Sequence, residues 1–415
     1  MKIWLIRYGE NLPIDGENPR MQRMGLLANK LSDLGIDVTW WTSTLNHYNN
    51  KTYRYHNDTD VKVNEHLLLK LIHSPYRYTK NVSVRRLFFQ WHIAYKFYRF
   101  ALKEEKPDLI LCAMPILEFL YFTRKYAKKM NIPYVVDVRD LNPDVFISPF
   151  SGVKRSIVKI AIKPLQWILS KGLNNAKGIC ATSEPYLSWA LNYARRSKNK
   201  NDNVFYVAYP DCNLPDKLSD NSRWSKYENY TGITCCFFGQ FGKIIDYDTI
   251  IETAGKCKDT HINVKFLLCG SGELFDYYKN IVSEKNLDNV ILPGWVDQKD
   301  IRDIGYISDA GLMSYKPNEA FNMQMPNKFS EYLALGLAIL LQPVGIMKEK
   351  IEDNKCGLHY ENTDELFEIL KYLSTHKEEL NTMKSNSRLL FEKSFTASVV
   401  YENYANYLIN LIKSK

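Results

Sequence analysis

A lysine and a glutamate, Lys328 and Glu331, stand three residues apart in the segment Met325–Leu341. The segment reads as one helix followed by a short apolar strand, and this spacing puts both side chains on one helical face. Lys328 falls in the first turn, where unpaired N–H groups and the helix dipole favour a phosphate. Glu331, one turn further in, suits a pair of sugar hydroxyls. A nucleoside diphosphate with its ribose satisfies both residues, and the other interpretation is an exposed helix with an ion pair.

The residues around this pair favour the nucleotide. In order they are Pro326, Lys328, Glu331, Tyr332, Ala334 and Gly336. They resemble the nucleotide-sugar signature P-x-K-x-x-E-Y-x-A-x-G-x-P of retaining GT-B glycosyltransferases of family 4, with Ala338 in place of the final proline. The resemblance implies that Lys328 neutralises a diphosphate and that Glu331 holds the ribose. It also implies an α/β fold of two tandem Rossmann-like domains facing a cleft, the GT-B fold.

Two glycine-bearing loops follow predicted strands in the same half of the chain. One carries Gly239 and Lys243, and the other carries Gly270 and Gly272. Glycines let backbone amides approach a ligand closely, so both loops are candidates for the nucleotide site, with Lys243 reaching the diphosphate. The family places an arginine where Gln240 stands here. The alternative is that both loops are ordinary strand-to-helix turns.

The sugar end of the donor is less well matched. Many family 4 members carry a first glutamate eight residues before the ribose-binding one, and that position is Met323 here. Glu319 lies nearby with a longer gap. We therefore expect Glu319 to contact the donor sugar in its place.

Charged residues also follow predicted strands in the first half of the chain. Arg139 and Asp140 come directly after an apolar strand and resemble the family's V-R-D segment, so they are acceptor-side candidates, with a structural ion pair as the alternative. Arg23 matches an R-x-x-x-L-A pattern, and the resemblance implies that it stabilises the departing diphosphate. His47 follows the second strand and is a third catalytic candidate, although a single histidine is more often structural.

Two Asp-x-Asp sequences raise the question of a metal. They begin at Asp58 and Asp246, and the second opens a predicted helix, where aspartate is favoured by the helix dipole. We expect no metal and no cofactor. The nucleotide diphosphate sugar is a substrate, and the resemblance implies that basic side chains and helix dipoles neutralise its phosphates.

Strands alternate with helices along the whole chain, which predicts parallel sheets covered on both faces. We expect an acceptor-side domain over 1–210, a linker over 211–230 and a nucleotide-sugar domain over 231–395. A last helix within 396–415 is implied by the resemblance to cross back to the first domain. The expected strands are Lys2–Tyr8, Asp37–Trp41, Leu109–Ala113, Tyr134–Val138, Gly178–Thr182, Val204–Val207, Thr234–Phe238, Lys265–Cys269, Val290–Leu292, Ala310–Met313 and Ala338–Leu341.

The composition is that of a globular protein with unevenly distributed charge. The formal net charge is +9, yet the stretch from Arg77 to Asn174 alone carries 18 Lys and Arg against 7 Asp and Glu. Two basic, aromatic-rich segments, Arg85–Phe100 and Lys154–Lys171, lie in it. They predict docking on a membrane surface, or half-buried helices whose cations reach water.

The eight cysteines include no C-x-x-C pair, and the first residues do not resemble a signal peptide. We therefore expect a cytoplasmic protein, peripheral on the inner face of the cytoplasmic membrane.

The resemblance implies a retaining glycosyltransferase with a lipid-linked or other oligosaccharide acceptor, in capsule or O-antigen synthesis. A nucleotide-sugar epimerase on the same fold is the first alternative. A non-catalytic basic module binding lipid or RNA is the second, although no RNA-binding motif is present and we expect no nucleic-acid partner.

Overall fold

The computed structural model describes residues 1–17, 19–47, 51–147, 150–214 and 216–414, without the side chains of 319–320. It contains two compact units. The first comprises Met1–Tyr206 together with Val400–Lys415, and the second comprises Val207–Val399.

The first unit is built on an eight-stranded sheet in the order β3-β4-β2-β1-β5-β6-β7-β8. Its strands are parallel except β3, which pairs antiparallel with β4 at one edge. The inner strands Leu109–Ala113 and Tyr134–Val138 are buried along their whole length and apolar apart from Asp137, as expected for a parallel sheet covered on both faces. The strands are β1 (Lys2–Ile6), β2 (Asp37–Ser43), β3 (Thr59–Lys62), β4 (Leu67–Ile72), β5 (Leu109–Ala113), β6 (Tyr134–Val138), β7 (Gly178–Ala181) and β8 (Asn203–Val204).

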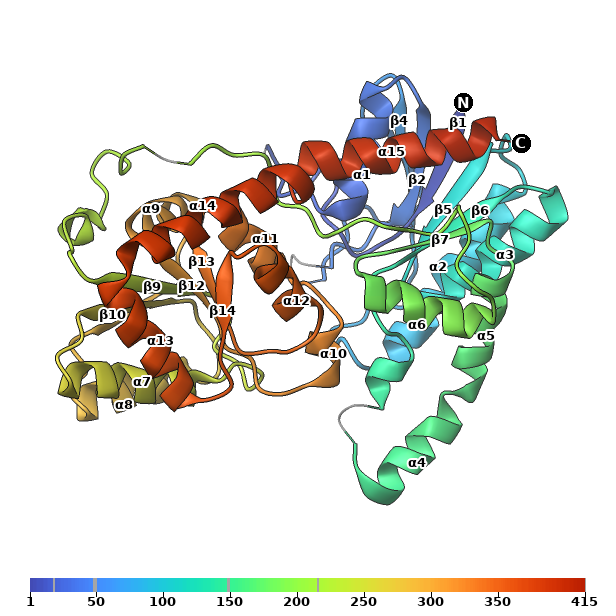
Figure 1. Cartoon of the computed structure of the whole chain (residues 1–415). Coiled ribbons are helices and arrows are strands. Elements are labelled where there is room, and N and C mark those ends of the chain that lie inside the picture. Colours follow the sequence, from blue (N-terminus) through green and yellow to red (C-terminus); the bar gives the residue numbers. More distant parts are fainter. Residues whose placement is uncertain (18, 48–50, 148–149, 215, 415) are drawn as a thin grey trace. The chain divides into compact units, whose positions relative to one another are not determined.

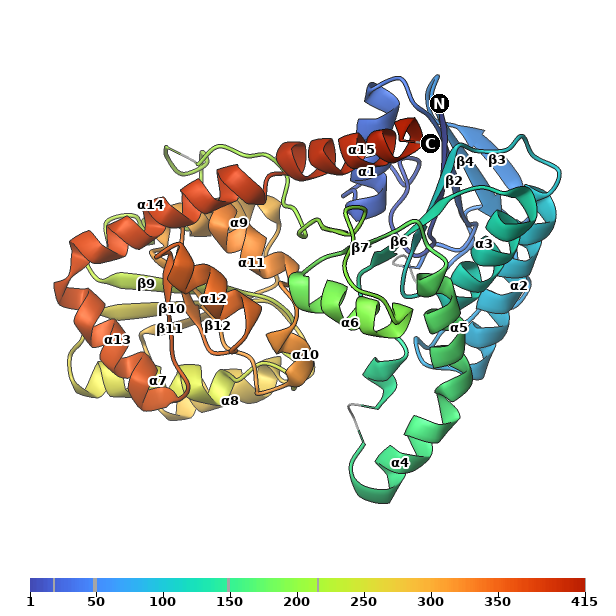
Figure 2. The same ribbon diagram turned by 45° about the vertical axis from the view of Figure 1, so that its right-hand side comes forward.

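Helices cover both faces of this sheet. In Figures 1 and 2, α2, α3 and α5 lie side by side on one face, and α1 and α15 lie on the other. This division follows from right-handed crossovers that run in opposite directions from β1. The helices are α1 (Arg23–Asp33), α2 (Val84–Ala101), α3 (Leu117–Met130), α4 (Gly152–Ala161), α5 (Lys163–Asn174), α6 (Glu184–Ala194) and α15 (Ala397–Lys413).

The last helix, α15, completes the first unit. The ring of Tyr404 stacks on Phe205 with centroids 4.1 Å apart, and the Tyr407 hydroxyl donates to the carbonyl of Asn201 at 2.6 Å. Tyr404 is fully buried, so α15 supplies part of the core of a unit that otherwise ends at Tyr206.

The second unit has a six-stranded parallel sheet in the order β11-β10-β9-β12-β13-β14. Counted along the chain, this is the 3-2-1-4-5-6 order of a doubly wound nucleotide-binding sheet, whose order reverses between its first and fourth strands. The strands are β9 (Ile233–Phe238), β10 (Val264–Cys269), β11 (Val290–Gly294), β12 (Ala310–Met313), β13 (Ala338–Leu341) and β14 (Gly357–His359).

In this unit α7, α8 and α13 cover one face of the sheet, and α9, α11 and α14 cover the other (Figures 1 and 2). Two of these helices begin at an aspartate whose side chain caps the helix. Asp246 caps α7, and Asp297 forms a capping box with Asp300 at α9. The helices are α7 (Tyr247–Asp259), α8 (Phe275–Glu284), α9 (Gln298–Ile307), α10 (Glu319–Asn322), α11 (Asn327–Ala334), α12 (Ile346–Asp353), α13 (Thr363–Thr375) and α14 (Lys377–Ser394).

The stretch 211–230, predicted as a linker, packs on the second unit. Its Ser219 and Ser222 hydroxyls donate to the buried Asp303 at 2.7 and 2.6 Å. The Trp224 indole donates to Asp300 at 2.7 Å. These contacts anchor the predicted linker to α9, so it belongs to the second unit. The first unit ends at Tyr206, four residues before the predicted end at 210.

Most predicted strands match observed ones within two residues, whereas β3, β4 and β14 were not predicted. β8 is shorter and begins one residue earlier than expected. Within the described residues, the longest helices are too polar to cross a lipid bilayer.

Candidate functional site

Lys328 lies where the order of the second sheet reverses. Its ammonium sits 3.6 Å from the ring centroid of Phe237 in β9 and 5.4 Å from that of Tyr315, just beyond β12. β9 and β12 are the two strands between which the order changes, and doubly wound sheets bind ligands at this point, beyond the carboxyl ends of the strands. The lysine was predicted from its spacing to Glu331, and the topology supplies an independent reason for the same site.

The surroundings of Lys328 leave its charge poorly compensated. The structure gives the ammonium two aromatic rings and no hydrogen bond or ion pair to any of the described side chains. Burial lowers the pKa of Lys328 to about 7, although Glu331 opposes the change. An anion reaching this ammonium would restore the charge that burial disfavours.

Glu331 and Tyr332 continue α11 into the unit. Glu331 is buried, one turn beyond Lys328, so the pair share a face as the spacing predicts. The Tyr332 hydroxyl donates to the carbonyl of Leu312 and accepts from the amide of Phe238, both at 3.3 Å. Tyr332 therefore fixes α11 to the two strands at the switch point, which holds Lys328 and Glu331 in place.

The two glycine loops pack directly against each other. The amide of Gly239 donates to the carbonyl of Cys269 at 3.0 Å, and the amide of Phe241 donates to that of Ser271 at 2.9 Å. A Cβ on Gly270 would lie 1.7 Å from the carbonyl oxygen of Gly239, and Gly270 has φ +146°. The contact between the loops therefore requires this glycine. This agrees with the alternative interpretation of the sequence, in which the glycines serve the turns themselves.

Gly239 and Gly272 have related roles. A Cβ on Gly239 would come within 2.9 Å of the Lys328 ammonium, so the missing side chain leaves room for the lysine beside β9. Gly272 has φ +155°, and a Cβ there would lie 2.5 Å from the carbonyl oxygen of Phe241. Gly239 links the first loop to the predicted diphosphate site, and Gly272 belongs to the packing between loops.

Lys243 points away from this arrangement. Its side chain is 78% exposed and lies 3.8 Å from Glu273 in an exposed ion pair. Such pairs are weak, so the ammonium is free to change partners. Its contact with a diphosphate stays a prediction.

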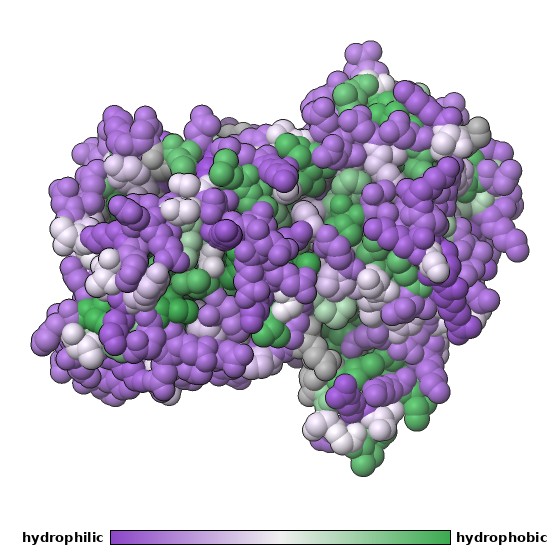
Figure 3. Space-filling view, in the orientation of Figure 1, coloured by the Kyte–Doolittle hydropathy of each residue, from purple (hydrophilic) through white to green (hydrophobic). Residues whose placement is uncertain are grey.

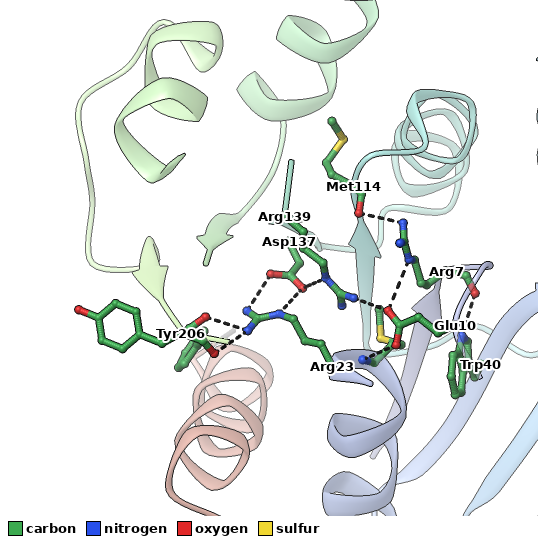
Figure 4. Close-up of polar contacts among 10 residues, drawn as sticks. Arg7, Glu10, Arg23, Trp40, Met114, Asp137, Arg139 and Tyr206 are labelled. Carbon is green, nitrogen blue, oxygen red and sulfur yellow. Dashed lines mark hydrogen bonds and ion pairs between the residues drawn. The ribbon is translucent and has the colours of Figure 1, made fainter. Parts of the chain in front are cut away.

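The first sheet reverses its order between β1 and β5, and charged residues gather there (Figure 4). Arg7, just after β1, donates through Nη1 to the carbonyl of Met114, just after β5, at 3.0 Å. Arg139 binds the Glu10 carboxylate through Nη1 and Asp137 through Nε at 2.6 Å. Its other terminal nitrogen, Nη2, is buried and has no hydrogen-bond partner among the described residues.

Arg23 joins the same network from α1. Its Nε and Nη2 donate to the two oxygens of Asp137, each at 3.0 Å, and its Nη1 donates to the carbonyls of Phe205 and Tyr206. Burial alone would raise the pKa of Asp137, but the charges and hydrogen bonds of Arg23 and Arg139 lower it to about 2. The structure thus uses Arg23 to hold α1, β6 and the segment before the second unit together, and its predicted contact with the departing diphosphate has no support from this arrangement.

The remaining acceptor-side candidates lie at the same edge of the first sheet. Burial raises the pKa of Asp140, which directly follows Arg139, although Arg7 opposes the change. The Nδ1 of His47 lies 2.8 Å from the Tyr78 hydroxyl, and burial together with Arg86 lowers the histidine pKa to about 4. His47 is therefore neutral near pH 7, with a ring held by Tyr78.

Comparison with known proteins gives this architecture a name. Residues 219–390 match the family model described as Glycosyl transferases group 1, and no curated protein matches the sequence. The structure of sucrose-phosphate synthase from Thermosynechococcus elongatus aligns with a TM-score of 0.68 at 14% identity, covering 100% of both chains. The chain has the GT-B fold.

Two other GT-B structures are similar over nearly the full chain. That of HepE from Anabaena, in complex with UDP, aligns with a TM-score of 0.66 at 15% identity, covering 99% of this chain and 100% of that one. WaaG, described as a glycosyltransferase involved in lipopolysaccharide biosynthesis, aligns with a TM-score of 0.60 at 14% identity, covering 97% and 98%. At such identities the likeness shows the fold, and the family match supports glycosyl transfer as the activity.

In this GT-B chain the predicted donor-sugar residue, Glu319, opens the short helix α10. Its side chain lies outside the described residues, so its role stays a prediction. The segment joins β12, just beyond which Tyr315 lies, to α11, which carries Lys328. It therefore connects two elements of the switch point.

The sequence analysis missed Arg7 and Glu10. Arg7 follows β1 directly and Glu10 lies in the loop after it. Glu10 is buried, and its carboxylate also accepts from the amide of Met24 at 2.9 Å. The signal was the one used for Arg139 and Asp140, charged residues after a buried strand.

Proposed function

We propose that the protein is a retaining glycosyltransferase that moves a sugar from a nucleotide diphosphate sugar to a hydroxyl of a lipid-linked oligosaccharide. The observation that carries the proposal is the Lys328 ammonium, buried beside Gly239 at the switch point of the second sheet, with no anionic partner in ion-pair contact among the described residues. A diphosphate is the anion that the group 1 match leads us to place there.

The bonds made and broken in retaining glycosyl transfer determine the charge that Lys328 must bind. In retaining transfer without a protein nucleophile, the acceptor oxygen bonds to the anomeric carbon on the face from which the diphosphate departs. The bond from that carbon to the diphosphate oxygen breaks, and the acceptor proton passes to the departing diphosphate. Negative charge grows on the diphosphate, so a cation already in place lowers the barrier. In our proposal Lys328 has this role, and Glu331 fixes the ribose.

The acceptor side of the proposal rests on the first unit. Asp140, a carboxyl group with a raised pKa, follows the strand that carries Asp137. Arg139 beside it has a buried N–H group without a hydrogen-bond partner among the described residues. We propose that Arg139 and Asp140 position the acceptor hydroxyl. His47 is neutral near pH 7 and lies at the same sheet edge, where it offers a hydrogen bond to a sugar hydroxyl.

The lipid-linked acceptor and a place in capsule or O-antigen synthesis have two supports. One is the excess of basic residues between Arg77 and Asn174. The other is the likeness to WaaG, a glycosyltransferase of lipopolysaccharide biosynthesis. With such an acceptor, the enzyme works on the inner face of the cytoplasmic membrane.

The first test is thermal stability against a panel of nucleoside diphosphates and nucleotide sugars, without added metal. UDP heads the panel because HepE was solved with it. A ligand at 100 times its dissociation constant stabilises a protein by about 2.7 kcal/mol. We expect one nucleotide to raise the Tm and Glu331→Ala to abolish that rise, while Glu368→Ala, on the surface of α13, keeps it.

Product analysis then tests the reaction. Transfer to an oligosaccharide acceptor with the anomeric configuration of the donor supports the proposal, and inversion excludes the retaining mechanism. Conversion of the nucleotide sugar without any acceptor identifies an epimerase instead. If no nucleotide or nucleotide sugar raises the Tm, the donor site proposed at Lys328 is excluded.

A further inference from the structure

Helix α4 has no buried residue along its length. Val153, Ile157 and Ile160 recur at helical spacing on one face and are 78%, 60% and 64% exposed. Figure 3 shows apolar side chains at the protruding end of the first unit, where Figure 1 places α4. A helix with a bare aliphatic face in water requires an explanation, because single exposed residues are common but aligned ones are not.

The neighbouring residues extend this apolar surface. The seven large hydrophobic side chains that are exposed between positions 145 and 167 are Val145, Phe146, Phe150, Val153, Ile157, Ile160 and Trp167. The whole described part of the second unit, about eight times longer, also exposes seven: Leu214, Ile244, Tyr277, Trp295, Val344, Tyr372 and Leu389. The apolar residues of the first group are therefore concentrated in one short stretch of the chain, and three of them lie on α4.

The other basic, aromatic-rich segment, Arg85–Phe100, lies in a helix that buries much of its apolar face. Helix α2 buries Phe89, Ile93 and Phe97 against the sheet and α3, and its Lys96 pairs with Asp58 at 2.6 Å. Much of α2 is thus a half-buried domain helix, as the second interpretation of the sequence predicted. Its first turns expose Val84, Leu87 and Phe88, and Tyr95 is exposed further along the helix.

Charge identifies what covers α4. Residues 145–175 contain five basic side chains and no Asp or Glu. All five cations are exposed, and on α4 Arg155 and Lys159 lie opposite the aliphatic row. They are Lys154, Arg155, Lys159, Lys163 and Lys171. A helix with one apolar face and only cations among its charged residues complements the interface of an anionic bilayer, whereas a protein partner would have to bring both an apolar surface and acidic groups.

A basic groove beside this element adds a place for headgroups. It lies between α5 and α6, has a volume of about 670 Å³ and is lined by Lys163, Trp167, Lys171 and Arg195 among others. Trp167 is 55% exposed at its rim. Indole rings favour the headgroup level of a bilayer, and lysine and arginine bind lipid phosphates there.

We propose that α4 is a membrane-insertion helix, which lies in the headgroup region of an anionic bilayer with Val153, Ile157 and Ile160 in the acyl boundary. The groove between α5 and α6 then receives lipid phosphates. α4 follows β6, and the first turns of α2 follow β4, so both apolar surfaces lie at the carboxyl edge of the first sheet, together with Arg139 and Asp140. This inference deepens the membrane part of the proposed function and places its acceptor-side residues at the edge that faces lipid.

Vesicle sedimentation of the full chain tests the proposal. The probes are vesicles of pure phosphatidylcholine and of phosphatidylcholine mixed with phosphatidylglycerol. We expect binding to the mixed vesicles only. Ile157→Glu should weaken it more than tenfold, because an isoleucine side chain is removed from the acyl boundary and a charge is added. Lys154→Gln with Lys159→Gln should weaken it about 25-fold, about fivefold for each cation.

The matched control is Leu389→Glu, an equally exposed leucine on α14 of the second unit, which should bind vesicles like the unchanged chain. Nucleotide-induced stabilisation, measured on every variant, should be unchanged. Equal weakening by Ile157→Glu and Leu389→Glu, or no binding to mixed vesicles at all, overturns the proposal. So does a dimer in solution that Ile157→Glu dissociates, because a second copy then covers α4.

The two proposals fail separately. If the unchanged chain does not bind mixed vesicles but is stabilised by a nucleotide, the membrane helix is overturned and the donor site stands. Absence of nucleotide stabilisation with vesicle binding intact overturns the donor site and leaves the membrane helix standing.

Discussion

A lysine ammonium between two aromatic rings is the residue on which the proposed donor site depends. Burial disfavours its charge and lowers its pKa to about 7, so near neutral pH the free protein holds Lys328 in both protonation states. A diphosphate binds the charged state. Nucleotide binding at Lys328 should therefore take up a proton when the pH is above this pKa.

The pH dependence of nucleotide affinity follows directly. Between pH 7 and 9 we expect the affinity for the diphosphate to fall, by up to about tenfold per pH unit, because the free ammonium becomes scarcer. Titration calorimetry in buffers of different ionisation enthalpy measures both the affinity and the proton uptake. Lys328→Arg keeps its charge and should remove the slope, whereas an unchanged slope in that variant would show that another group titrates.

His47 predicts how the stability of the protein changes at acidic pH. Its pKa is about 4 in the folded protein and about 6.5 when unfolded, so between these values the unfolded chain binds more protons. The free energy of unfolding should therefore rise with pH across this window and fall on acidification. Urea unfolding at pH 7 and pH 5 should show a smaller loss for His47→Gln. Equal losses in both proteins would mean that the imidazole is already charged in the native state.

Side-chain arrangements that depend on nearby positions could be predicted from the sequence. Lys328 and Glu331 share a face because they are three apart on one helix, and the sequence contains that spacing. Arg23 was not predictable in the same way. Its partner, Asp137, is 114 positions away, so the sequence showed a cation beside a helix start and not the carboxylate that holds it.

At the scale of elements, the two glycine loops of the second unit act as one. Gly270→Ala should disrupt them, because the new Cβ would meet the carbonyl oxygen of Gly239 and because φ +146° strains any other residue. We expect a lower Tm and loss of nucleotide binding. Gly255→Ala is the control: it lies inside α7 with its nearest neighbour 3.9 Å from the new Cβ, and should raise stability by about 0.4–1 kcal/mol. If both variants behaved alike, the contact between the loops would not constrain the unit.

Elements were predicted unevenly for a physical reason. The strands β5, β6, β12 and β13 were predicted at their observed bounds because each is a short run that is apolar apart from Asp137 in β6. Near-continuous apolar runs are typical of buried parallel strands. β3 alternates exposed and partly buried residues at the edge of the sheet, so its sequence resembles a polar loop. β4 has the apolar pattern of a strand but was passed over inside a polar stretch.

At the scale of the whole molecule, the proposed site predicts where a nucleotide acts. Hydrogen exchange with saturating UDP, or with the nucleotide that raises the Tm, should slow in the loops at 238–243 and 269–274 and at the start of α11. We expect the amides of the first sheet to stay unchanged. Lys328→Met should lose this protection. Protection confined to the first unit would place the nucleotide elsewhere.

The assignment of α15 to the first unit has a consequence for synthesis on the ribosome. Residues 1–206 emerge first, yet their core is incomplete until Tyr404 stacks on Phe205 and the Tyr407 hydroxyl meets the carbonyl of Asn201. The second unit, continuous from Val207 to Val399, is made in between and has all its strands before α15 appears. The half synthesised first is therefore finished last, and a nascent chain stalled before position 400 would carry a complete second unit beside a first one that chaperones still have to protect.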